Sequence, residues 1–373
     1  MTVHLYHDSI SHPGGGTATY LDALARHAHA SGIRIAIHVV ELLPSPVVAG
    51  LERDGIPVYR QRRIPGDRWH LRKRAMIWRL GRRLAPGDWV FAVCPPYAPV
   101  YEPLVKTVHA RKAKLGVSWF LAPEFWPPTP NLMGESGPSF CRAIAATDAV
   151  VSVSRCTTHQ FAEVYGYSGP VPIVPYHNRV FFPEPLPLPP GPPWHIGFLG
   201  RIDREQKNLD GLIRAFARLA GERNDVFLDL FGEGPDRAGL ERLAADCGVS
   251  QSVLFHGPYD HRSDLHGVLS RCHFVVHPSR WEGGPCFSLL EAMQAGRWCV
   301  ASSVGGIPDL FEGHPECGFL VPRGDDGSQL LEGLRRGIEL VSTNRIDVSA
   351  IRNRYHDGFD MESAHRAWLA TLD

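Results

Sequence analysis

The sequence predicts an α/β protein made of two doubly wound, Rossmann-like parallel-sheet domains. Its 373 residues are enough for two domains of ordinary size. Short apolar runs alternate with helical patterns, as expected for parallel strands joined by helices. Seven prolines between Pro183 and Pro193 suggest a stiff connector. We therefore expect a first domain over residues 1–182, a hinge over 183–193, a second domain over 194–350 and a helix within 351–373 that returns to the first domain.

Composition and charge narrow the class of protein further. Hydrophobic residues make up 44% of the chain, and no stretch approaches the ~20 consecutive apolar residues of a membrane-spanning helix. The formal net charge is zero, so nucleic acid is not an expected partner. The eight cysteines form no Cys-x-x-Cys pair, and we expect reduced thiols and no metal site. The N-terminus enters a strand pattern without a signal-peptide pattern, so we expect a cytoplasmic protein.

Strands are predicted where short apolar runs end at turn residues. In the first half they cover residues 2–8, 33–42, 89–95, 114–122, 149–154 and 171–175. In the second half they cover residues 194–200, 226–232, 253–257, 274–278, 299–304 and 318–322. Helical patterns fill most of the gaps, for example over residues 18–30, 209–220, 287–295 and 361–372. Buried strands of this kind are typical of parallel sheets with helices on both faces.

The stretch WEGGPCFSLLEAM, residues 281–293, combines a glycine-rich turn with two carboxylates. It follows a buried strand and leads into a helix, so its backbone N–H groups form a ready anion site. Glu282 precedes the helix and Glu291 lies on its second turn. The alternative is a surface turn with two solvated glutamates.

A second loop, residues 201–208, places cations before a helix. Gly200 ends the preceding strand, Arg201 follows it, and Lys207 lies just before the helix. A helix N-terminus disfavours cations unless an anion lies between them. Arginine grips phosphate with a planar fork and lysine acts as a point charge, so this loop indicates a phosphate site.

The N-terminal half has a glycine loop of its own. Gly15 and Gly16 lie between the first strand and the first helix, which is the usual start of a nucleotide-binding α/β domain. The Gly-x-Gly-x-x-Gly spacing of dinucleotide sites is absent. A plain flexible turn is the alternative.

Together these motifs resemble those of the retaining nucleotide-sugar glycosyltransferases of family 4, also called glycosyltransferase group 1. The strand ends at Gly232-Glu233, His256-Gly257, residues 305–309 and residues 318–325 have counterparts in that family, in the same order. The ordered match covers about residues 195–330, whereas the first half matches only loosely. One departure is that eight residues separate Glu282 from Glu291, where the family has seven, and we interpret this as a one-residue bulge.

The resemblance implies the GT-B fold, in which two Rossmann-like domains face each other across a cleft. It implies a donor on the C-terminal domain, with Glu282 near the sugar hydroxyls and Glu291 near the ribose. The catalytic residues would be Arg201, Lys207 and Glu282. The donor-binding residues would be Gly15, Gly16, Gly200, Arg201, Lys207, Glu233, His256, Gly257, Glu282, Gly283, Gly284, Cys286, Phe287, Ser288 and Glu291.

The acceptor is expected on the N-terminal domain, beyond the strand 114–122. Trp119, Glu124, Phe125 and Trp126 are the candidates, because ligands bind beyond the carboxyl ends of strands and aromatic rings pack on sugars. The histidine that family members often carry at this strand end is missing. Core packing is the alternative for each aromatic ring.

Residues 60–83 carry ten Arg or Lys residues and one acid, Asp67, with Trp69 and Trp78 among them. A basic helix with aromatics suits an anionic membrane surface or a phosphorylated acceptor. The alternative is a solvated helix face. We therefore expect that this cytoplasmic protein can also bind peripherally to the inner face of the membrane.

The predicted function is retaining, metal-independent transfer of a sugar from a nucleotide-diphosphate sugar to a glycan, glycolipid or natural-product hydroxyl. No Asp-x-Asp spacing occurs, so Arg201 and Lys207 would replace the metal. No cofactor is expected, and a UDP-sugar is favoured over a GDP-sugar as the donor. The alternatives are a nucleotide-sugar epimerase on the same fold and a non-catalytic sugar-nucleotide binding protein.

Overall fold

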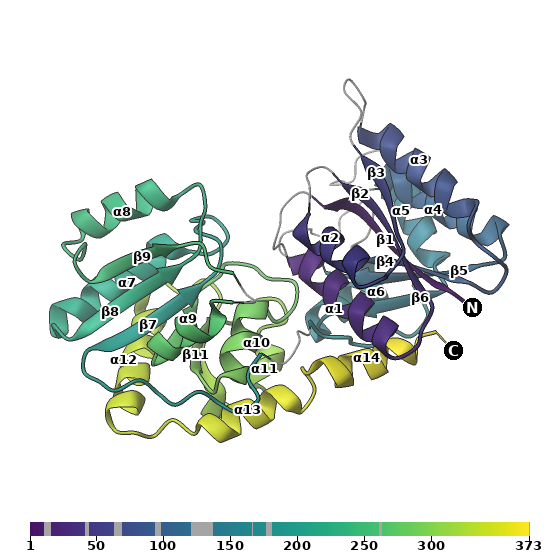
Figure 1. Cartoon of the computed structure of the whole chain (residues 1–373). Coiled ribbons are helices and arrows are strands. Elements are labelled where there is room, and N and C mark those ends of the chain that lie inside the picture. Colours follow the sequence, from purple (N-terminus) through teal and green to yellow (C-terminus); the bar gives the residue numbers. More distant parts are fainter. Residues whose placement is uncertain are drawn as a thin grey trace. The chain divides into compact units, whose positions relative to one another are not determined.

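A computed structural model describes residues 1–10, 16–41, 45–62, 69–93, 98–120, 137–165, 167–176, 181–260 and 263–372. The chain forms two compact units (Figure 1). The first comprises Met1–Asn178 and Met361–Asp373, and the second comprises Arg179–Asp360. Both contain a six-stranded parallel sheet flanked by helices, which confirms the predicted fold class.

The first unit has the strand order β3-β2-β1-β4-β5-β6. Its strands are β1 Val3–Ile10, β2 Ile35–Glu41, β3 Val58–Arg62, β4 Trp89–Val93, β5 Lys114–Trp119 and β6 Ala149–Ser152. Its helices are α1 Gly16–Ala30, α2 Pro46–Arg53, α3 Trp69–Gly81, α4 Ala98–Ala110, α5 Gly137–Ala145, α6 Arg155–Val164 and α14 Met361–Leu369. The order reverses between β1 and β4, which is where doubly wound sheets place their ligand crevice.

Two features of the first unit differ from the sequence expectation. Residues 171–175 do not form a sheet strand, and Ile173 makes only an isolated bridge to Ser152. The edge strand β3 was not predicted, because its sequence VYRQR lacks an apolar run. The first residues of the basic segment 60–83 therefore belong to a strand, and its helix is α3.

The second unit has the strand order β12-β11-β10-β7-β8-β9. Its strands are β7 Trp194–Leu199, β8 Val226–Phe231, β9 Val253–Gly257, β10 Phe274–His277, β11 Trp298–Ser302 and β12 Gly318–Val321. Its helices are α7 Leu209–Glu222, α8 Arg237–Asp246, α9 Leu265–Arg271, α10 Phe287–Gln294, α11 Pro308–Phe311, α12 Ser328–Ser342 and α13 Val348–His356, with a short 3-10 turn at Pro315–Cys317. Every predicted strand of this half lies within two residues of an observed one.

The proline-rich segment belongs wholly to the second unit, so it is not the connector that we expected. The buried Arg297 guanidinium donates to the carbonyl oxygens of Leu186 and Pro187, each at 2.8 Å. Arg352 likewise donates to Pro183 at 2.8 Å. These bonds hold the segment against its own unit, and the chain changes unit after Asn178 and again after Asp360.

The C-terminal segment packs on the first unit from Met361 onward, where α14 contacts α1. Trp368 is fully buried and meets Phe91 edge to face, with ring centroids 5.3 Å apart. The Trp89 indole donates to the carbonyl oxygen of Leu372 at 3.0 Å. None of the described helices combines the length and apolar character that a membrane span requires.

Candidate functional site

The carboxyl ends of β7, β8 and β9 are joined through their backbones. The Gly200 amide donates to Phe231 at 3.0 Å, and the Gly232 amide donates to Gly257 at 2.8 Å. A Cβ atom on Gly232 would lie 1.8 Å from the Gly200 carbonyl oxygen, and its φ of 142° is one that other residues rarely adopt. The glycines that end these strands therefore let the three loops meet at one edge of the sheet.

Arg201 lies at the start of the loop after β7, and its side chain is 56% exposed. Its guanidinium donates to the Gln206 side chain at 2.7 Å and pairs with Asp203 at 3.1 Å. Gln206 in turn donates to the carbonyl oxygen of Trp281 at 3.3 Å. The loop 201–208 is thus folded back on itself and tied to the loop after β10, its neighbour in the sheet.

The predicted Lys207 and Glu282 come together at this edge of the sheet. The Lys207 ammonium pairs with Glu282, and both side chains are nearly buried. Burial alone would raise the pKa of the Glu282 carboxyl, but the charge of Lys207 and the bond from His277 hold it far below its usual range. Glu282 is therefore ionised at neutral pH and unsuited to act as a general acid.

His277, at the end of β10, lies beneath this ion pair and was not predicted. Its Nε2 lies 3.1 Å from Glu282 Oε1 and 3.0 Å from Ser279 Oγ. Its Nδ1 lies 3.4 Å from Ser288 Oγ on α10. Burial alone would lower the pKa of His277, but the interactions with Cys286 and Glu282 outweigh it and raise that pKa to about 9. A charged imidazolium thus connects the strand, the loop and the helix.

The predicted loop residues surround the start of α10. Gly283 and Gly284 precede it, Cys286 is its N-cap, and Phe287 and Ser288 form its first turn. The Cys286 thiol lies 3.5 Å from the Ser288 hydroxyl. A Cβ atom on Gly305, in the loop after β11, would lie 1.7 Å from the Glu282 carbonyl oxygen. Three neighbouring strand ends, those of β7, β10 and β11, therefore shape one site.

Glu291 is fully buried on α10. Burial raises the pKa of Tyr259, in the loop after β9, well above its usual value, and the negative charge of Glu291 raises it further. Contact between Glu291 and a ribose stays a prediction.

Two other predicted donor residues have partners of their own. Glu233 pairs with Arg237 at 3.1 Å. His256 Nε2 lies 2.6 Å from Asp229 Oδ1, and its ring stacks on Phe231 with centroids 4.4 Å apart. The buried Asp229 also bonds His195 at 2.7 Å, so one carboxylate on β8 connects β7 with β9. Asp229 and His195 were not predicted, because no motif marks them.

The predicted residues of the first unit fare differently. Gly16 begins α1, whereas Gly15 lies outside the described residues, as do Glu124, Phe125 and Trp126. Trp119 is fully buried in the core and meets Tyr165 edge to face at 5.2 Å. The structure therefore corrects the role of Trp119, which stabilises the core and offers no surface to an acceptor.

The second unit is similar to known proteins. Residues 186–347 match the family described as glycosyl transferases group 1, and that range includes every described donor-site candidate except Gly16. An uncharacterized glycosyltransferase of Bacillus subtilis is 37% identical over 106 residues, which is 28% of each chain. The 2-deoxystreptamine glucosyltransferase of Streptomyces kanamyceticus is 36% identical over 128 residues, 33% of this chain and 31% of the relative. The matched segments thus span about a third or less of these curated relatives.

The fold is shared over the whole chain. The crystal structure of HepE from Anabaena in complex with UDP-glucose superposes with a TM-score of 0.74. It covers 100% of this chain and 99% of that one, at 18% sequence identity, so the likeness is one of fold. The chain therefore has the GT-B fold, and its residues 186–347 match the glycosyl transferases group 1 family.

Proposed function

We propose that the protein is a glycosyltransferase that moves a sugar from a nucleotide-diphosphate sugar to an acceptor hydroxyl. The observation that carries the proposal is the meeting of Lys207 and Glu282 beside the N-terminus of α10. A cation for phosphate, a carboxylate for sugar hydroxyls and helix N–H groups for a second phosphate oxygen lie at one sheet edge. The family match over residues 186–347 supports this interpretation.

The proposed chemistry rests on charge and position. Cleavage of the bond between the anomeric carbon and the phosphate oxygen leaves a diphosphate with additional negative charge. Lys207 and the exposed Arg201 would stabilise that charge, and Glu282 would orient the sugar. We propose that transfer retains the anomeric configuration and requires no metal, with the departing phosphate oxygen accepting the proton of the acceptor. No strong side-chain base is then required.

Donor binding is tested first by thermal unfolding with UDP, GDP and ADP, because a ligand of the folded state raises the midpoint. We expect UDP to give the largest shift, a choice supported by the UDP-glucose complex of HepE. Glu291→Gln should weaken the best nucleotide if this residue reaches the ribose. An unchanged nucleotide affinity in that variant would remove the ribose assignment.

Activity is tested by donor turnover with and without acceptors. Turnover that depends on an acceptor supports transfer, release of nucleotide without an acceptor indicates an epimerase or hydrolase, and binding without turnover indicates a binding protein. The name of the Streptomyces relative makes 2-deoxystreptamine a reasonable first acceptor, beside glycans and lipid-linked sugars. Trp126, outside the described residues, remains an acceptor hypothesis, and Trp126→Ala should raise the acceptor KM without lowering the Tm.

We also propose that α3 and α4 contact an anionic membrane surface. Trp78 is 60% and Leu71 52% exposed, and the guanidinium of Arg82 lies 5.0 Å from the Trp78 ring centroid. Arg74, Arg82, Lys106 and Arg111 line a groove around Trp78. Helix α3 contains no acid. Exposed aromatics among cations suit the interface of an anionic bilayer.

A further inference from the structure

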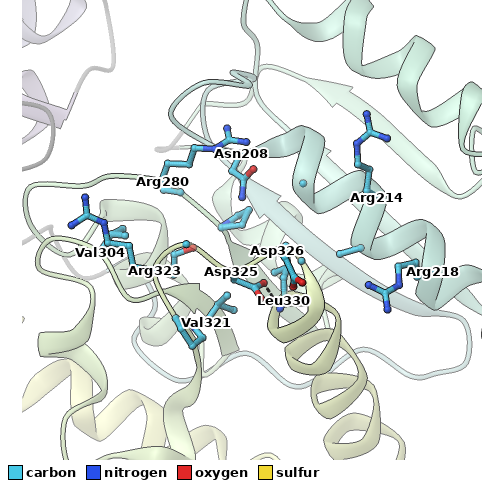
Figure 2. A pocket seen from close by; sticks show the side chains of 18 residues that line it. Asn208, Arg214, Arg218, Arg280, Val304, Val321, Arg323, Asp325, Asp326 and Leu330 are labelled. Atoms are coloured by element: carbon cyan, nitrogen blue, oxygen red, sulfur yellow. Dashed lines mark hydrogen bonds between the residues drawn. The ribbon is translucent and has the colours of Figure 1, made fainter.

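A cavity of about 500 Å³ lies in the second unit, beside α7 and the start of α12. Figure 2 shows its wall formed by α7, by the loops that follow β10 and β11, and by the loop from β12 to α12. None of the residues predicted to bind the donor lines it. Its volume is within the range of small-molecule sites.

The cavity combines an apolar floor with a charged rim. Ala215, Val304, Val321 and Leu330 are buried at its floor. Four arginines stand around it: Arg214 and Arg218 on α7, Arg280 after β10, and Arg323 after β12 (Figure 2). With two aspartates, Asp325 and Asp326, the lining has more positive than negative charge.

The aspartates are already engaged by the helix. Asp325 accepts from the amides of Gln329 and Leu330, each at 3.0 Å, and Asp326 accepts from the Ser328 amide at 3.0 Å. Arg214 and Arg218 are exposed and make no hydrogen bond within the described part of the chain, although the charge of Arg218 contributes to lowering the pKa values of Asp326 and Glu222. Both side chains can therefore turn toward a bound anion without breaking an existing hydrogen bond.

Arg280 connects the cavity to the donor site. Its backbone amide donates to Gln206 at 2.8 Å. Its guanidinium donates to the carbonyl oxygens of Arg204 and Glu205, the latter at 3.1 Å, and pairs with Asp210 at 3.3 Å. The same side chain thus lines the cavity and fixes the backbone that leads to Lys207.

We propose that this cavity binds a small organic phosphate, and that the bound phosphate competes with Asp210 and the loop carbonyls for Arg280. Arginine favours phosphate because its fork matches two phosphate oxygens, and the apolar floor accommodates the carbon skeleton of the ligand. Occupancy would loosen the loop 201–208 and change the position of Lys207. By linkage, phosphate binding would then change the affinity for the donor, and donor binding would change the affinity for the phosphate by the same factor. This regulatory part rests on the proposed donor function, whereas binding itself does not.

The binding test uses glucose 1-phosphate as the probe and glucose as its neutral control, measured by calorimetry on the full chain. Arg214→Gln/Arg218→Gln should raise the Kd at least about tenfold, since two charge-assisted contacts are lost. Arg242→Gln, an exposed arginine on α8 outside the cavity, should leave it unchanged. Arg201→Gln removes a donor-site cation and should also leave it unchanged. Binding that is absent, or lost in Arg201→Gln but kept in the double variant, would overturn the proposal.

The coupling test needs no turnover. Hydrogen exchange of amides 204–208 should become faster in the wild-type protein when glucose 1-phosphate is added. It should not change in Arg214→Gln/Arg218→Gln at the same concentration. Bound phosphate without any change in exchange would show that the site does not act on this loop, and would refute the regulatory part.

Discussion

Lys207 and Glu282 form a nearly buried ion pair, although 75 positions separate them in the sequence. Lys207 ends the loop after β7 and Glu282 lies in the loop after β10, and these strands are neighbours in the sheet. In the proposed function, a donor phosphate would share the Lys207 ammonium group with a carboxylate that is already in place. It also keeps Glu282 ionised and oriented before any sugar arrives.

Removal of Lys207 should therefore destabilise the second unit. Lys207→Met leaves the nearly buried Glu282 carboxylate with His277 as its remaining positively charged partner. We expect the free energy of unfolding to fall by about 3 kcal/mol. Lys207→Met/Glu282→Gln should lose less than the two single changes added together. Denaturant unfolding of the four proteins measures this. Additive losses would mean that the two charges do not interact. Arg335→Gln, at the exposed pair with Glu222, is the matched control and should have little effect.

Stability should depend on pH through His277. Its folded pKa of about 9 is above the ordinary histidine value of 6.5, so the native state holds a proton that the unfolded state loses first. The stabilisation is complete below about pH 6.5 and is lost as pH rises through about 9. Wild-type unfolding free energy should thus decline across this interval, and His277→Gln should flatten the decline.

Cys286→Ser should lower the pKa of His277 measured by NMR, because Cys286 is one of the groups that raise it. An unaltered His277 titration in this variant would contradict that cause.

Arg201→Ala should slow sugar transfer at least tenfold, because a charge-assisted contact to phosphate is worth about 1.5–3 kcal/mol. EDTA should leave the wild-type rate unchanged. His314, Glu316 and Cys317 place one potential metal ligand each within 4.8 Å of one another, so the chelator also tests whether an ion there matters. A rate that collapses in EDTA and returns with a divalent ion would end the metal-independent mechanism.

Binding to vesicles should depend on the surface of α3 and α4. Trp78→Ala and Arg74→Gln/Arg82→Gln should each reduce co-sedimentation with vesicles of one part phosphatidylserine to several parts phosphatidylcholine. Binding of the wild-type protein should weaken with salt, because exposed charges are screened over about 8 Å at physiological ionic strength. Arg242→Gln serves as the control. Equal sedimentation of all variants, or none of the wild type, would indicate a solvated helix face.

Local patterns were sufficient for much of the second unit. Buried parallel strands are continuous apolar runs, and glycines mark where they end, so the strands and the loops that carry Arg201, Lys207 and Glu282 could be placed from sequence. The edge strand β3 was missed because VYRQR has no such run. Trp119 was predicted at the acceptor site but is buried in the core. An aromatic residue at a strand end has the same local sequence pattern whether it faces the core or a ligand.

The sequence by itself thus determined the fold class, the order of strands and helices in the second unit, and the residue types of the proposed phosphate and sugar site. Only the tertiary structure decided which of those residues meet. The pairing of Lys207 with Glu282, the support from His277 and the bonds of Asp229 to His195 and His256 depend on which strands are neighbours. Local periodicity does not encode that order, because it is set by how whole strands and helices pack. The same holds for the bonds of Arg297 and Arg352 to the proline-rich segment, which lies in the second unit.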